Sequence, residues 1–235
     1  MIAPGNATTK HWRRMFSYRA FVRVFFGATC TALIATHANA NLLTNGSFEL
    51  GTLVNDGNQT MTFSAGPTNI TGWAAAGRQV SWIDTGNPFF LTAQDGNRFL
   101  DLTAYITGAP FGGVTQNVAT TVGEQYDLSF YLGSYTQRWG GPPVSISASA
   151  AATSQSFTVS TTSTASSWTP FSMLFTATSA TTAITLTGLA GIEYIGLDNV
   201  SVDPAGASVP EPKSYVLMVA GLGLLGMAGH RRIRQ

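Results

Sequence analysis

The stretch Tyr126-Asp127-Leu128-Ser129-Phe130-Tyr131-Leu132 sets an apolar side chain at every second position, with Tyr126, Leu128, Phe130 and Leu132 in phase. In a β-strand successive side chains point to opposite faces, so this phase gathers the four on one face. A helix would need a spacing of 3.6 residues instead. The stretch therefore predicts a strand with one buried face.

The same alternation recurs along the chain in further runs, which are Val144/Ile146/Ala148, Phe157/Val159, Phe171/Met173/Phe175 and Ile184/Leu186. Glycine-rich stretches at 112–113, 140–143 and 188–191 are expected to break the chain between strands. No segment between the two ends shows a convincing amphipathic helical period. Many short strands with frequent turns predict an all-β domain over residues 41–203, folded as a β-sandwich.

Charge is segregated along the chain. The span 41–209 holds three arginines against ten carboxylates, a net charge of −7, and no lysine. An acidic, lysine-free surface repels phosphate backbones, which excludes nucleic acid as a partner. Neutral glycans, or acidic glycans bridged by a divalent cation, are compatible with this charge.

The same span also has no histidine and no cysteine. It therefore lacks the usual general base at neutral pH, the thiol and amine nucleophiles, and the ligands that zinc and copper prefer. These absences argue against catalysis and favour a binding or structural role.

The N-terminal 40 residues have the layout of a secretory signal peptide. Basic residues up to Arg23 precede the apolar run 24–35, which is too short to span a bilayer stably. Ala38 and Ala40 supply the small residues that signal peptidase accepts, so cleavage is expected after Ala40. The alternative is an uncleaved N-terminal membrane anchor.

The C-terminal end has three parts. A linker over 204–213 contains Val209-Pro210-Glu211-Pro212, an apolar helix is expected over 214–229, and the segment 230–234 is rich in arginine. This order resembles the PEP-CTERM sorting signal of Gram-negative bacteria. The resemblance implies processing by exosortase, an inner-membrane intermediate, and delivery to the cell surface or extracellular matrix. Proteins with this signal accompany exopolysaccharide production and biofilm formation. In the sorting signal, 214–235 is expected to form a transmembrane helix and a basic tail. The alternative is an ordinary tail anchor.

Two end motifs of the domain resemble galactose-binding-like jelly rolls. They are the stretch 41–49, which ends in Ser47-Phe48-Glu49, and the stretch 194–202, which contains Leu197-Asp198-Asn199-Val200. Similar patterns occur in carbohydrate-binding modules of families 4, 9 and 22 and in a family of plant cell-wall proteins. The resemblance implies a jelly-roll sandwich whose first and last strands are neighbours. It also implies a structural calcium held by Glu49 and Asp198. The alternative is that both carboxylates are solvated or hydrogen-bonded at strand ends.

Sugar sites combine aromatic faces with a few polar groups. Trp139 stands in an apparent loop beside Tyr135 and Arg138, and Tyr105 is a second candidate at a loop or strand end. These four residues are the predicted ligand-binding set, with packing at the end of the sandwich as the alternative for Trp139. Trp73 and Trp82 are expected in the core, and the stretch 95–97 is expected to form a turn before a strand. Asp84, Arg98 and Asp101 are weaker candidates for the site.

Three functions follow from these patterns. The first is non-catalytic binding of exopolysaccharide or another glycan at the cell surface. The second is a purely structural surface or biofilm protein without a ligand site. The third is a glycosidase that uses two carboxylates about 5–9.5 Å apart.

Overall fold

The computed structural model describes residues 41–135, 141–161 and 165–206. The predicted signal peptide and sorting tail lie outside these residues, as do Arg138 and Trp139. The described residues form ten strands, which are β1 (Thr60–Pro67), β2 (Ala74–Asp84), β3 (Arg98–Asp101), β4 (Gly112–Ala119), β5 (Gln125–Ser134), β6 (Val144–Ala150), β7 (Thr153–Val159), β8 (Ser167–Thr176), β9 (Thr181–Ala190) and β10 (Gly196–Pro204). Within them no helix reaches the length and hydropathy of a membrane span.

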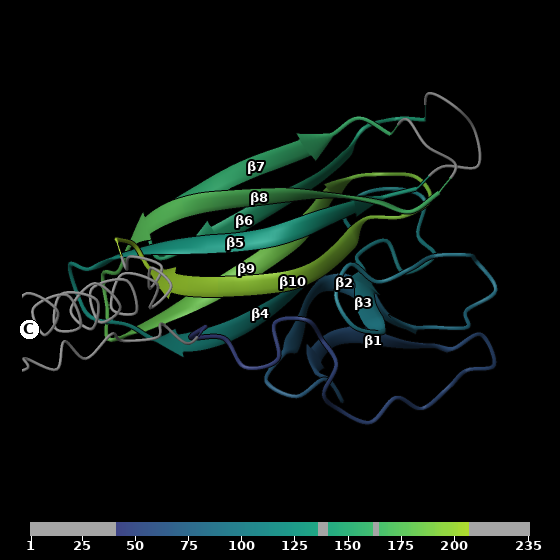
Figure 1. Cartoon of the computed structure of the whole chain (residues 1–235), viewed down its shortest axis with the longest axis horizontal. Coiled ribbons are helices and arrows are strands. Elements are labelled where there is room, and N and C mark those ends of the chain that lie inside the picture. The colour runs from purple at the N-terminus through teal and green to yellow at the C-terminus, as the bar shows by residue number, and fades with distance from the viewer. Residues whose placement is uncertain (1–40, 136–140, 162–164, 207–235) are drawn as a thin grey trace, which may run out of the picture. The chain divides into compact units, whose positions relative to one another are not determined.

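All strand pairs are antiparallel, and β2 is the strand that joins the two layers. Hydrogen bonding runs in the order β7-β6-β9-β4-β2-β3-β10-β5-β8, with β1 also paired to β2. The first part of β2, Ala74–Gly77, pairs with β4, and its last part, 81–84, pairs with β3. One layer thus holds β4, β6, β7 and β9, and the other holds β3, β5, β8 and β10 (Figure 1). The prediction of an all-β jelly-roll sandwich is confirmed.

The core fills the space between these layers with the alternating residues of the predicted strands. Leu128, Phe130 and Leu132 of β5 are buried, as are Ile146 on β6 and Ile184 on β9. The tryptophans expected in the core, Trp73 and Trp82, are buried too.

An aromatic cluster ties the two layers together at one edge. The Phe157 ring on β7 lies 5.2 Å from the Phe130 ring on β5 and 5.2 Å from the Phe171 ring on β8. Because β7 and β8 are the two ends of the strand order, these contacts close the sandwich along the edge where no strand pairing is made.

Of the three glycine-rich stretches expected to separate strands, 112–113 begins a strand and all but Gly191 of 188–191 belongs to one, so the expectation was wrong at these positions. Gly112 and Gly113 begin β4, and Gly188 is within β9. The physical reason is close packing. A Cβ on Gly112 would stand 1.6 Å from the Gln79 carbonyl oxygen, and one on Gly188 would stand 2.9 Å from Cβ of Phe111.

The N-terminal segment of the domain lies along the last strand without forming a strand itself, whereas the first described strand, β1, pairs with β2 and not with β10. Leu42 donates its backbone N–H to the Val202 carbonyl (2.9 Å), and Val200 donates to the Gly46 carbonyl (2.9 Å). The Asn41 amide extends this pairing, since its Oδ1 accepts the Val202 N–H at 3.0 Å. The first described residues therefore belong to the fold and are held on β10.

The loops around Ser134 and the point where the chain leaves the sandwich lie at opposite ends of the domain, because β5 runs from one end to the other. β5 begins at Gln125, whose carbonyl accepts the N–H of Ala205 just after β10 ends. Nine residues later, β5 ends at Ser134, beside the start of β10 at Gly196. At about 3.3 Å per residue, the end that carries the loops around Ser134 lies about 30 Å from the end where the chain leaves the sandwich.

Candidate functional site

A hollow of about 460 Å³ opens at the end of the sandwich where β5 stops and β10 starts. Its walls come from three parts of the chain: the loop after β2, the turn after β3, and the residues that flank β5 and β10. The lining residues are Ile83, Pro88, Phe89, Phe90, Leu91, Asp101, Tyr105, Tyr135, Glu193 and Tyr194. We call this hollow the aromatic pocket, because five of these ten side chains are aromatic.

The floor of the aromatic pocket is a small second core on the outer face of the β3–β10–β5–β8 layer. Ile83, Leu91, Phe99 and Tyr194 are buried together there, separate from the main core. The Phe99 ring meets the rings of Trp168 and Tyr194 edge to face, at 5.7 and 5.6 Å. This arrangement gives the pocket a rigid floor that does not depend on a ligand.

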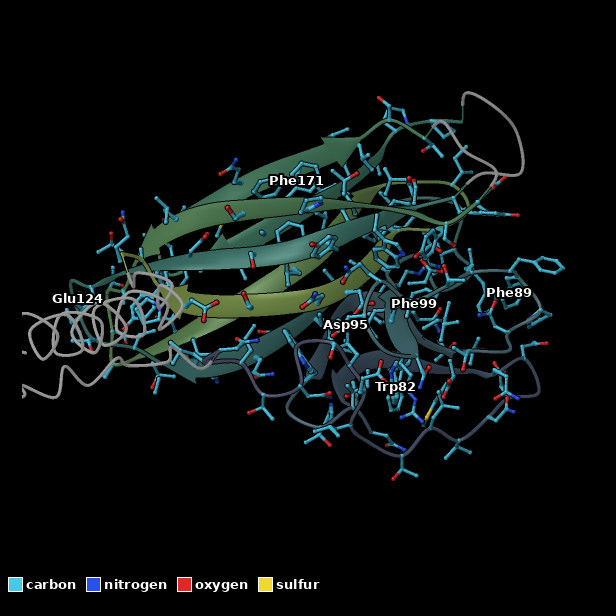
Figure 2. The ribbon with its side chains drawn as sticks, in the orientation of Figure 1. Trp82, Phe89, Asp95, Phe99, Glu124 and Phe171 are labelled. Carbon is cyan, nitrogen blue, oxygen red and sulfur yellow. The ribbon has the colours of Figure 1, made fainter. Side chains whose placement is uncertain are left out.

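The loop over residues 85–97 covers this floor and is held at several points. The Asn87 amide donates to the carbonyls of Asp84 and Leu91 and accepts the Phe89 N–H. The Trp168 indole donates to the Thr92 carbonyl at 3.1 Å. Figure 2 shows Phe89 and Phe99 on the side of β1–β3, far from Glu124 at the start of β5. The loop is therefore a fixed wall of the pocket.

Two aromatic side chains at the pocket stand out in solvent. Phe90 is 85% exposed and Tyr105 is 58% exposed, and they are the only exposed aromatic residues in the described part of the chain. Both have left-handed backbone, with φ of 60° and 67°. Non-glycine residues adopt that conformation at a cost, and five others in the described residues, Asn45, Phe48, Gln59, Ala151 and Asn199, adopt it away from the pocket.

A polar relay fixes Tyr105. Its hydroxyl lies 3.2 Å from the Thr60 Oγ1, and that hydroxyl donates in turn to Asp56 Oδ2. This hydrogen bond is the main reason that the pKa of Asp56 is lowered below its ordinary value. The Tyr105 ring also meets the Phe89 ring edge on, at 6.0 Å. The exposed face of Tyr105 is thus held in one position.

Two carboxylates line the aromatic pocket, and they differ in their surroundings. Asp101 is buried and accepts hydrogen bonds from Thr103 and from the N–H of Ile195. Burial raises its pKa above the ordinary value. Glu193 is exposed at the rim. Thr103 and Ile195 thus engage the oxygens of Asp101, and Glu193 is the carboxylate that stands at the rim next to the aromatic faces.

The described residues bring two of the four predicted ligand-binding residues together. Tyr105 and Tyr135 line the same pocket, from the turn after β3 and from the end of β5. Arg138 and Trp139 lie outside the described residues. Of the weaker candidates, Asp101 lines the pocket, but Asp84 and Arg98 pair with each other instead, with Arg98 Nε 2.8 Å from Asp84 Oδ2 and its guanidinium stacked on Trp82.

The main pocket residues that the sequence analysis missed are Phe89 and Phe90. They follow Asn87-Pro88 directly, so two aromatic residues stand next to turn-forming residues outside any alternating run. That combination is the signal that would have marked this loop as a site.

Glu49 and Asp198 both accept hydrogen bonds from the backbone of the turn over 94–98. Glu49 binds the last two residues of this turn, and Asp198 binds the first two. Glu49 Oε1 accepts the N–H groups of Asn97 and Arg98, at 2.8 and 2.7 Å. Asp198 Oδ2 accepts those of Gln94 and Asp95, at 2.7 and 3.0 Å. The two carboxylates thereby fix the turn that leads from the pocket wall into β3. The turn expected at 95–97 is confirmed.

Asp198 is fully buried. Burial raises its pKa from the ordinary 3.8 to about 7, although backbone N–H groups act in the opposite direction. A raised pKa means that the negative charge is under-compensated, which a bound cation would correct. No group of three or more acidic, histidine or cysteine side chains suited to a metal occurs within the described ranges. A calcium ion here would therefore need carbonyl oxygens beside the two carboxylates, which is a usual ligand set.

Comparison with known proteins gives one family over the domain and one motif over the tail. The family model described as protein of unknown function, DUF642, matches residues 41–193. The PEP-CTERM protein-sorting motif matches residues 208–232, which include Val209 to Pro212. No curated protein matches the chain.

Several solved carbohydrate-binding modules are similar in structure. A CBM61 module in complex with β-1,4-galactotriose is 17% identical, with a TM-score of 0.46 over 70% of this chain and 99% of that one. The CBM22-1 xylan-binding domain of Xyn10C from Paenibacillus barcinonensis is 18% identical, with a TM-score of 0.41 over 67% and 99%. A CBM4 structure is 17% identical, with a TM-score of 0.41 over 69% and 99%.

The DUF642 model covers the domain from its first described residue into the last turn before β10, and thus well over half of the chain. The chain belongs to the DUF642 family and carries a PEP-CTERM sorting motif at its C-terminal end.

Proposed function

We propose that this protein is a non-catalytic glycan-binding protein of the bacterial surface, and that the aromatic pocket is its binding site. The observation that carries the proposal is the position of Phe90 and Tyr105. Both exposed aromatic side chains of the described residues stand at one hollow, on left-handed backbone, beside the Glu193 carboxylate at its rim. Flat apolar faces with a few placed polar groups are what a sugar ring needs.

The size of the hollow fits a carbohydrate chain. Its volume of about 460 Å³ lies within the ~300–1,000 Å³ usual for ligand sites. A second hollow that shares Tyr135 and Glu193 holds only about 20 Å³, which is room for a water molecule and not for a sugar ring. The ligand we infer is a segment of a polysaccharide, which the aromatic pocket alone would hold.

The sorting motif supports a surface role. The described domain ends at 206 and the motif match begins at 208, so the chain that joins them is short. The aromatic pocket lies at the far end of β5 and β10 from that junction. After export and handling by exosortase, the pocket would face away from the membrane, toward exopolysaccharide.

Calcium is part of this proposal as a structural ion. Glu49 and Asp198 would hold it against the 94–98 turn, and its charge would offset the buried Asp198 carboxylate. In that position the ion would stiffen the loop that carries Phe89 and Phe90. It has no part in contacting the glycan.

A glycosidase is the second candidate, because Asp101 and Glu193 line one aromatic pocket. Against it, Oδ1 of Asp101 accepts hydrogen bonds from the N–H groups of Thr103 and Ile195 and from the Thr103 hydroxyl, and Oδ2 accepts the same hydroxyl. These bonds commit the carboxylate to holding two turns together. Release of reducing ends from exopolysaccharide by the full chain would favour the enzyme. A purely structural protein would not need two exposed aromatics at one hollow.

Calorimetric titration tests the binding site. The full chain in detergent is titrated with sized fragments of the producing bacterium's exopolysaccharide, alongside Phe90→Ala, Tyr105→Ala and the double variant. Each single change is expected to weaken binding at the aromatic pocket about tenfold, or about 1.4 kcal/mol, because an exposed stacking face is lost. The double change should abolish binding at this pocket.

Leu174→Ala is the matched control, since Leu174 is 53% exposed on β8 and lies outside the pocket. It removes exposed apolar surface without touching the site. Equal affinity of wild type and the double variant would overturn the proposed site.

A further inference from the structure

A second hollow, of about 750 Å³, lies beside β4, and it shares no residue with the aromatic pocket. Its position follows from the strand pairing. The β2–β4 ladder ends at the pair Ala74–Thr115, so the next β4 residues, Gln116 and Asn117, have no β2 partner. The turn over 67–73 and Thr44, from the N-terminal segment of the domain, surround the space that is left. We call it the amide hollow.

Hydrogen bonds fix the walls of the amide hollow. The buried Gln116 side chain accepts the Thr44 N–H at 2.6 Å and donates to the Thr44 carbonyl at 2.9 Å. Trp73 lines the hollow as a buried indole, fixed by its Nε1 bond to the Asn45 carbonyl at 2.9 Å. Thr68 donates its hydroxyl to the Trp73 carbonyl at 2.7 Å. These contacts hold both sides of the hollow in place.

The amide hollow offers polar groups and no charge. None of its twelve lining residues is acidic or basic. Among the described residues, no hydrogen bond engages the side-chain hydroxyls of Thr44 and Thr71 or the side-chain amide of Asn117, and all three residues are exposed. Hydroxyls and an amide near an indole suit a ligand that is neutral and rich in hydroxyl groups.

The sheet next to the amide hollow has the same character. β4, β6, β7 and β9 contain no aspartate, glutamate, lysine or arginine. Their outward side chains are mostly serine and threonine, some of them paired, such as Thr115 with Thr185 at 3.1 Å. The carboxylates of the domain are thus kept away from this face, which disfavours a cationic or anionic partner.

We infer that the amide hollow is a second glycan-binding site, specific for a neutral polysaccharide segment. With the aromatic pocket, on whose proposed function this role depends, it would make the protein bivalent. A domain with two separate sites can hold two polysaccharide chains at once. The consequence is a cross-linking protein of the matrix.

The test uses calorimetric stoichiometry with the neutral fraction of sized exopolysaccharide fragments. Asn117→Arg puts bulk and charge into the amide hollow, and Gln125→Arg, an exposed position on β5 in the other layer, is the matched control. Thermal unfolding checks that each variant folds. Wild type and Gln125→Arg are expected to bind two fragments per chain, and Asn117→Arg one.

The two sites can fail separately. Two bound fragments that fall to one in Phe90→Ala/Tyr105→Ala, and to none when Asn117→Arg is added, support both sites. One fragment per wild-type chain, unaffected by Asn117→Arg, overturns the amide hollow and leaves the aromatic pocket intact. Loss of binding in Asn117→Arg alone, with no effect at Phe90 and Tyr105, keeps the amide hollow and overturns the aromatic pocket.

Discussion

Gly112→Ala is expected to unfold the domain or to cost at least about 4 kcal/mol of its free energy of unfolding. The added Cβ would stand 1.6 Å from the Gln79 carbonyl oxygen and 2.9 Å from Val80 Cγ2. The first obstacle is backbone in the middle of β2, so it cannot turn aside as a flexible side chain could. β2 joins the two layers of the sandwich, and a shift there disturbs both.

Urea unfolding of the full chain, followed by tryptophan fluorescence, measures the change. Gly108→Ala is the matched control, because a Cβ at Gly108 meets nothing within 4 Å. The control should stay within about 0.5 kcal/mol of wild type. A Gly112→Ala variant as stable as the control would mean that β2 and β4 are not packed as described.

The stability of the calcium-free domain is expected to fall as pH rises from about 4 to about 7. Asp198 has a pKa of about 7 in the folded protein against an ordinary 3.8. Between these values the folded state holds a proton that the unfolded chain has released, so acidification favours folding. The difference corresponds to roughly 4 kcal/mol across this window. Asp101, whose pKa is also raised by burial, acts in the same direction.

Asp198→Asn isolates this effect. Asparagine keeps an acceptor for the N–H groups of Gln94 and Asp95 but does not titrate, so the pH slope in chelator should be much shallower. Added calcium should raise the wild-type free energy of unfolding at pH 7 and leave the variant nearly unchanged. Equal slopes for wild type and variant in chelator would contradict the assignment, and equal calcium effects would contradict the ion site.

The strands could be predicted because their information is local. The alternation of Leu128, Phe130 and Leu132 and that of Ile184 with Leu186 reports which face is buried, whatever lies opposite. Glycine was misread for the converse reason. This strand position needs glycine at 112 because the Gln79 carbonyl, far away in the sequence, leaves no room for a Cβ. That close approach depends on tertiary structure and cannot be read from the local sequence.

The aromatic pocket was only half predictable from the sequence. Tyr105 stood out at a loop or strand end and Tyr135 beside Trp139 in an apparent loop, and the two tyrosines do share one hollow. Phe90 could not be placed, because its exposure depends on a loop that is fixed from elsewhere, by Trp168 and by Asp198. The amide hollow left no sequence signal, since it arises where one ladder ends.

Hydrogen exchange of the full chain with and without exopolysaccharide fragments tests the central proposal most directly. The glycan-binding pocket predicts slower amide exchange on binding in the segments 89–91 and 103–106, which carry Phe90 and Tyr105. Strand β5 near Gln125 should not change. If bound fragments leave both segments as fast as in the free protein, the aromatic pocket is not the glycan site.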